Sequence, residues 1–213
     1  MSERVKIILD KNADILRLPA IALRGLVVFP GNIIHFEVGR KKSIAAIEWA
    51  MSNNNAVFLT AQQDMDVEDP GFKDLYAYGV VAEVKQVLRV SDELVKVLVE
   101  GKYRAKLLTL DSSGRFLLAS TKAAALRGTK SVDSARVEAL VRSVKEAFEE
   151  YLSLNPRLSK DVVYTIITNE DAALLCDYIP ANLLLKYTDK QALLNEGTVS
   201  VSYTHLTLPT NRE

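Results

Sequence analysis

The hydrophobic pattern of this chain changes its period near residue 127, and this change limits the possible folds more than any other feature. Before Leu126, short apolar runs alternate with turn sequences, as in β-strands. From Asp133 to Leu154, apolar residues recur every three or four positions, as on one face of a helix. The chain therefore predicts an α+β protein with a β-rich lobe at residues 18–126 and a helical lobe at residues 127–198.

The first lobe is predicted to be a small β-barrel with one helix. Pro30 and Gly31 form a turn between strands 21–29 and 33–38, because proline presets φ and glycine permits a positive φ. A helix follows, for which Ser43 is the expected N-cap. Its buried face is predicted to comprise Ile44, Ile47 and Met51. Further strands are predicted at residues 56–61, 79–90, 94–100, 103–110 and 115–122, enough to close a small barrel.

The second lobe is predicted to be a helical bundle. The predicted helices cover residues 133–154, a short segment capped by Ser159, residues 170–178, and a segment that begins at Thr188. Pro156 ends the first of these helices, because proline disfavours helical geometry in the residue before it. Thr188 and Gln191 have the spacing of a capping box.

The two ends of the chain are expected to lie outside both lobes. Residues 1–17 are interpreted as an N-terminal leader. Residues 199–213 alternate like a strand and contain Pro209, so they cannot continue an amphipathic helix. We expect this tail to be non-native, since it resembles read-through into cloning or adapter DNA.

Four sequence segments together identify a family resemblance. They are LPAIALRGLVVFPGNIIHFEVGR (18–40), GRKKSIAAIEWAM (39–51), DLYAYGVVAEVKQVLRV (74–90) and VKVLVEGKYRAKLL (95–108). In this order and spacing, the chain resembles the N-terminal substrate-recognition domain of the Lon family of bacterial ATP-dependent proteases. The resemblance covers residues 18–197 and implies a barrel similar to PUA-like domains, followed by a helical lobe.

The resemblance also implies a function and partners. The parent protein would be a cytoplasmic, homohexameric, ATP-dependent serine endopeptidase that degrades misfolded and short-lived regulatory proteins in protein quality control. This chain would be its non-catalytic recognition module, and its partners would be unfolded or degron-bearing proteins and other Lon subunits. ATP and magnesium would belong to the ATPase and peptidase domains, and this chain would need no cofactor. A stand-alone binding module without a protease remains an alternative.

Composition argues against several other classes of protein. The chain has 27 basic and 27 acidic residues, so it lacks the basic excess of a surface dedicated to nucleic acid. A PUA-like RNA-binding domain is the less favoured alternative, because Tyr103 stands nearly alone as a stacking aromatic. No apolar run reaches the roughly 18 residues of a membrane span, and the first residues do not form a signal peptide. We therefore expect a soluble cytoplasmic chain without membrane contact.

The sequence offers no catalytic, cofactor-binding or metal-binding residues. Lys42-Ser43 and Lys130-Ser131 lack the glycine spacing of a phosphate loop. Cys176 is the single cysteine, which excludes an internal disulfide and a multi-thiol metal site. His35 has only one other histidine in the chain, too few for a histidine triad.

The candidate substrate-binding residues are apolar and lie beside two turns. A domain that captures unfolded chains needs exposed apolar side chains. The candidates are Phe29, Pro30 and Ile33 at the first turn, and Val90 and Leu94 at the hairpin tip. For Phe29 and Ile33, the alternative is that both side chains close one end of the barrel.

Overall fold

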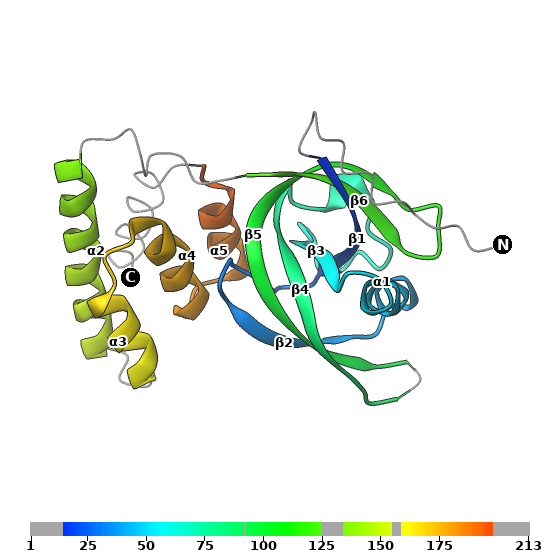
Figure 1. Ribbon diagram of the computed structural model, residues 1–213, viewed down its shortest axis with the longest axis horizontal. Coiled ribbons are helices and arrows are strands. Elements are labelled where there is room, and N and C mark those ends of the chain that lie inside the picture. Colours follow the sequence, from blue (N-terminus) through cyan, green and yellow to red (C-terminus); the bar gives the residue numbers. More distant parts are fainter. Residues whose placement is uncertain (1–14, 92, 125–133, 155–158, 198–213) are drawn as a thin grey trace. The chain divides into compact units, whose positions relative to one another are not determined.

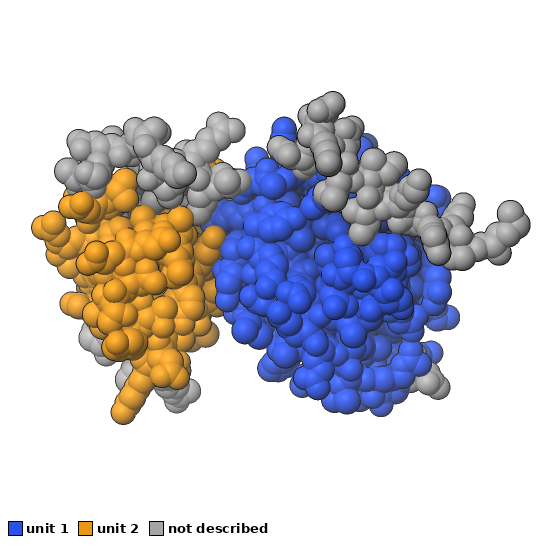
Figure 2. Space-filling view, viewed as in Figure 1, with its two compact units in different colours: residues 1–124 blue, residues 125–213 orange. Residues whose placement is uncertain are grey.

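The computed structural model describes residues 15–91, 93–124, 134–154 and 159–197 (Figure 1). The chain divides into two compact units, residues 1–124 and residues 125–213 (Figure 2). Most of the predicted leader, the lobe boundary near residue 127 and the predicted tail lie outside the described residues.

In unit 1, five strands close a barrel (Figure 1), and a sixth strand, β2 (Ile33–Val38), extends the sheet by pairing with β5 (Val95–Asp111). The other strands are β1 (Ile15–Leu23), β3 (Ala56–Ala61), β4 (Tyr78–Arg89) and β6 (Leu117–Ala123). Their order is β2-β5-β4-β3-β1-β6, and the additional β5–β6 pairing closes the barrel. Only the β1–β3 pair is parallel among the described pairings. The predicted β-barrel lobe with one helix is confirmed.

The first strand differs from its prediction at both ends. β1 begins at Ile15, inside the predicted leader, and ends at Leu23 instead of Phe29. Gly25 has a φ of 62°, and the chain leaves the sheet there. The following residues Val27, Val28 and Phe29 are buried without joining a strand. An apolar run reports burial and does not distinguish a strand from a buried connection.

β5 is one long strand, whereas the sequence predicted two separate strands in this part of the chain. β5 contains 17 residues and pairs with β2, β4 and β6. The register of β5 against β4 shifts between the β4 residues Val81 and Ala82, and Gly101 of β5 lies at this point. The shift bends the strand without ending it, as β-bulges do.

Helix α1 (Lys41–Met51) packs against β1 and β3, but its first residue was wrongly predicted. Its buried face was predicted in part, since Ile47 is buried and Ile44 packs against the core. Arg40 occupies the N-cap position, and Ser43 is the third residue of the helix. Met51 is 44% exposed. The buried residues are Ser43, Ala45, Ala46, Ile47 and Ala50. Most of these side chains are small, which lets the helix axis lie close to the sheet.

Two clusters of buried apolar side chains lie on opposite faces of the sheet of unit 1, because their residues alternate along the shared strands. One cluster includes Val97 and Ile47 of α1, and the other includes Phe58 and Leu107. Small barrels with packed interiors hold no large internal ligand cavity. A surface feature of this unit is therefore a better place to look for a binding site than its interior.

Unit 2 is helical. Its helices are α2 (Ser134–Leu154), α3 (Lys160–Thr168), α4 (Ala172–Asn182) and α5 (Tyr187–Asn195). A short 3₁₀ turn, Phe72–Asp74, belongs to unit 1. Ser159 caps α3 as predicted, because its Oγ accepts a hydrogen bond from the Val162 N–H at 3.3 Å. The predicted helical lobe is confirmed.

Two helix boundaries in unit 2 were wrongly predicted. α4 continues through Pro180 to Asn182, since proline in the last turn removes only one backbone hydrogen bond. α5 begins at Tyr187, without a capping box at Thr188. The Gln191 side chain is instead fully buried, and its Nε2 donates to Asn195 Oδ1 at 2.8 Å.

Candidate functional site

The turn at Pro30 and Gly31 fixes β2 against β5. Gly31 has a φ of 73°, and its N–H donates to the Gly101 carbonyl oxygen at 2.8 Å. The Phe29 side chain is completely buried, so it belongs to the barrel core and is not available to a substrate in this conformation. This placement is the alternative that the sequence left open for Phe29. Pro30 is half-buried beside it.

Ile33 lies at the start of β2 and is 62% exposed. It pairs with Glu100 of β5, on the face of the sheet that points away from the barrel interior. The alternative in which Ile33 closes the barrel end does not fit this exposure. Ile33 stays in the candidate set.

The hairpin between β4 and β5 exposes apolar side chains near its tip. Val90 is 56% exposed, and Leu94 is half-buried. The Leu94 carbonyl oxygen accepts hydrogen bonds from the N–H groups of Val90 and Ser91, at 3.0 and 3.1 Å. Leu88, which the sequence analysis missed, is 59% exposed. Leu88 precedes Val90 by two residues in a strand-like segment, and alternate strand residues point to the same face, so its exposure could have been predicted from the sequence. Leu88, Val90 and Leu94 are called the hairpin surface below.

The structure does not bring all the predicted residues together. Ile33 pairs with Glu100, whereas Val38, at the other end of β2, pairs with Val95 near the hairpin. Glu100 and Val95 are five residue steps apart along β5, which corresponds to about 17 Å. Ile33 and the hairpin surface are therefore separate apolar regions.

Four charged residues lie beside Ile33 and form the charge cluster: Glu83, Lys85, Glu100 and Lys102. Each lysine Nζ lies within 3.0 Å of a carboxylate oxygen of both glutamates. Hydrogen bonds from Lys102 and then Lys85 lower the pKa of Glu100 to about 2. The same contacts raise the pKa of both lysines and lower that of Glu83. The four charges balance one another, so this region presents no net charge to a partner.

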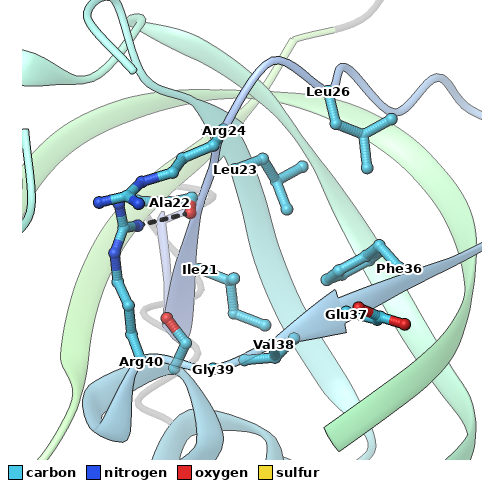
Figure 3. A pocket seen from close by; sticks show the side chains of 11 residues that line it. Ile21, Ala22, Leu23, Arg24, Leu26, Phe36, Glu37, Val38, Gly39 and Arg40 are labelled. Carbon is cyan, nitrogen blue, oxygen red and sulfur yellow. Dashed lines mark hydrogen bonds between the residues drawn. The ribbon is translucent and has the colours of Figure 1, made fainter. Parts of the chain in front are cut away.

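A pocket of about 300 Å³ lies between the end of β1 and the end of β2 (Figure 3). Its apolar lining consists of Ile21, Ala22, Leu23, Leu26, Phe36 and Val38. Figure 3 shows the side chains of Arg24 and Arg40 together on one side and those of Phe36 and Glu37 on the other. The pocket therefore combines an apolar wall with a cationic end.

Arg40 holds the walls of this pocket together. Its guanidinium donates to the carbonyl oxygens of Ala22 and Val67, at 3.0 and 3.2 Å, and to Gln62 Oε1. Arg24 donates to the same Val67 carbonyl at 3.2 Å. Burial, followed by the nearby charge of Arg24, lowers the pKa of Arg40, while the charges of Asp69 and Glu68 act in the opposite direction. Two guanidinium groups thus stand close together at the pocket end.

The described residues do not assemble a recognisable catalytic or metal-binding group. Within that part of the chain, no three His, Cys, Asp or Glu side chains gather closely enough to hold a metal ion. Cys176 is fully buried in α4, and His35 is exposed on β2. No helix among the described residues has the length and hydropathy needed to cross a membrane.

The comparison with known families decides the identity of the fold. Residues 17–205 match the family described as the ATP-dependent protease La (LON) substrate-binding domain. The chain belongs to this Lon domain family. The matched range covers both units and reaches into the segment that the sequence analysis interpreted as a tail.

Curated relatives place the Lon domain within much longer proteins. The Lon protease of Desulforamulus reducens is 38% identical over 183 residues, which are 86% of this chain and 22% of that protein. The Lon protease of Escherichia coli strain K12 is 36% identical over 190 residues, which are 89% of this chain and 24% of that protein. The chain therefore spans about a quarter of the length of these relatives.

Solved structures show the same fold. The N-terminal domain of a Mycobacterium avium complex Lon protease has a TM-score of 0.74 at 20% identity, covering 92% of this chain and 99% of that one. A Lon N-terminal domain protein from Xanthomonas campestris has a TM-score of 0.61 at 13% identity, covering 89% and 96%. At these identities, the likeness concerns the fold alone.

The helical unit of this Lon domain exposes apolar side chains that the sequence analysis did not select. They are Tyr164, Ile167, Leu174 and Leu184. Tyr164 and Ile167 lie on α3, and Leu184 follows the end of α4. Exposed apolar groups are thus present on both units, and the sequence predicted Ile33, Val90 and the half-buried Leu94 among them.

Proposed function

We propose that this chain is the substrate-recognition region of a bacterial Lon protease and that it captures unfolded or degron-bearing proteins. The parent protein would be a cytoplasmic homohexamer that degrades these proteins as an ATP-dependent serine endopeptidase. ATP and magnesium would act in other domains of the parent protein, and recognition by this chain would need no cofactor.

One observation carries the proposal: a chain matched to a substrate-binding family exposes apolar side chains on a well-formed hairpin. Leu88 and Val90 project from paired strands, so their exposure follows from the fold. Unfolded proteins offer apolar side chains that folded proteins bury, and exposed apolar surface discriminates between the two.

The proposal is tested by replacing Leu88 and Val90 with serine. Binding of a fluorescently labelled, reduced and alkylated model protein is measured by anisotropy. A single recognition region is expected to bind at about micromolar concentration or more weakly, because an unfolded partner must lose conformational entropy. We expect the double substitution to weaken binding about tenfold while circular dichroism stays unchanged.

Met65→Ser is the matched control, because Met65 is an exposed apolar residue of the same unit outside the hairpin. We expect this variant to bind like the parent chain. Unchanged binding of a correctly folded Leu88→Ser/Val90→Ser variant would exclude the hairpin surface as the capture site. Equal weakening by the Met65 control would indicate nonspecific apolar adsorption.

A further inference from the structure

The cationic end of the pocket coincides with an uncapped helix N-terminus. α1 begins at Lys41, and the N-cap residue Arg40 makes no side-chain capping hydrogen bond. The first turn also contains no acidic residue. The first N–H groups of a helix lack intrahelical partners and carry a partial positive charge, which favours an anion.

Ser43 supplies a second, independent indication of a ligand. Its side chain lines the pocket and is only 4% exposed, yet it has no hydrogen-bond partner among the described residues. Ser43 Oγ is not among the fully buried side-chain atoms of the described residues that lack a hydrogen-bond partner, so the hydroxyl is open to the pocket. The Ser43 hydroxyl and the guanidinium of Arg24 are therefore both available to a group that accepts hydrogen bonds.

The edge of β2 provides a place for an extended chain next to this pocket. β2 is the last strand in the sheet order, and no other described strand lies on its free side. Gly101 N–H donates to the Asn32 carbonyl oxygen at 2.9 Å, which sets the alternation of the β2–β5 ladder. Because alternate residues of an antiparallel pair exchange hydrogen bonds, the backbone groups of Ile33, His35 and Glu37 face away from β5.

We propose that this pocket binds the C-terminus of a polypeptide substrate. The terminal carboxylate would lie at the N-terminus of α1, beside Arg24 and the Ser43 hydroxyl. The last side chain would fill the apolar wall around Phe36, and the preceding residues would pair with the free edge of β2. This inference rests on the proposed function, and it assigns a substrate class to a pocket that borders the hairpin surface where Gly39 lies against Leu94.

The direction of β2 determines the direction of the bound chain. β2 runs towards Arg40, so a carboxylate at that end requires the substrate to lie parallel to β2. Pairing with β2 supplies backbone hydrogen bonds that do not depend on the sequence of the substrate, while the pocket selects the last side chain of the substrate. Glu37, on the opposite side of the pocket, disfavours substrates with an additional acidic group there.

The test uses two labelled hexapeptides that differ only at the C-terminus. Both end in leucine, one with a free carboxylate and one with an amide, and anisotropy measures their binding to the full 213-residue chain. We expect the free acid to bind about tenfold more tightly, because charge-assisted hydrogen bonds are the strong ones. The comparison needs no change in the protein, so it does not depend on the folding of a variant.

A substitution at Arg24 then locates the carboxylate. Arg24 is exposed, so Arg24→Gln is expected to keep the fold. It should remove most of the preference for the free acid, because it weakens binding of the acid far more than binding of the amide. Arg142→Gln, at an exposed arginine of α2, is the control and should retain the full preference.

The outcomes separate this inference from the proposed function. Equal binding of acid and amide, absence of peptide binding, or a preference that survives Arg24→Gln would overturn the C-terminal site. The unfolded model protein is titrated into the same samples. If it binds normally while the peptides show no preference, the C-terminal inference alone fails. If it does not bind either, the proposed function fails as well.

Discussion

At the scale of single residues, the charge cluster contains two ion pairs, each formed by a glutamate and a lysine two positions apart on one strand. Glu100 and Lys102 lie on the same strand, and β4 places Glu83 and Lys85 opposite them. Two lysines hydrogen-bonded to two carboxylates favour the charged forms of all four groups. Such exposed pairs are screened by salt and stabilise proteins only modestly.

Glu100→Gln is expected to lower the melting temperature at pH 7 by no more than about 3 °C. The pKa of Glu100 is lowered from 4.5 to about 2 in the folded chain. Its stabilising effect is therefore fully present above pH 4.5 and is lost as the pH falls towards 2. The melting temperatures of the variant and the parent chain should converge at pH 2, and also in about 1 M salt at pH 7.

Glu138→Gln, at an exposed position of α2 outside the charge cluster, is the control for this experiment and should leave the melting temperature at pH 7 unchanged. A difference between the Glu100 variant and the parent chain that stayed constant from pH 7 to pH 2 would contradict the linkage argument.

At the scale of elements, the sequence predicted the barrel, its helix and the helical lobe, but it misplaced several boundaries. Local signals were sufficient for the Pro30-Gly31 turn and for the Ser159 cap. The end of β1 and the continuity of β5 depend on which strands pair, and pairing over long sequence distances leaves no local pattern. The start of α1 was misplaced because Arg40 takes the N-cap position without a capping side chain.

The candidate site was predictable only in part, for the same reason. The exposure of Val90 followed from its place near a hairpin tip, whereas the burial of Phe29 depends on its contact with β5. The pocket joins residues of β1, β2 and α1 whose proximity arises only from the fold. No motif in the sequence indicated that Arg24 and Ser43 line one pocket.

Gly101→Ala is expected to destabilise unit 1 by about 3 kcal/mol. A Cβ atom at this position of β5 would lie 2.2 Å from the Phe29 carbonyl oxygen, a backbone atom that cannot move aside alone. Urea denaturation followed by circular dichroism measures the change. Gly114→Ala is the control, since the nearest atom to its Cβ would be 3.7 Å away, and a change within about 0.5 kcal/mol is expected. Equal stability of the two variants would mean that the turn can shift away from β5.

At the scale of the whole molecule, unit 1 contains everything that its own core requires. Both hydrophobic clusters of the barrel consist of residues from this unit, and the β5–β6 pairing closes the sheet within it. The hairpin surface and the pocket also belong to unit 1. A unit with its own closed sheet and core satisfies the physical requirements of an independent domain.

A chain of residues 1–124 is therefore expected to fold alone and to keep both binding activities. Circular dichroism should show a strand-rich protein with one cooperative thermal transition, because the buried contacts of the barrel are retained. The affinity for the free-acid hexapeptide should stay within about threefold of that of the full chain, since no element of the pocket has been removed. Loss of cooperative unfolding would show that the barrel needs the helical unit for stability. A folded barrel with strongly weakened peptide binding would show instead that residues 125–213 contribute to the site.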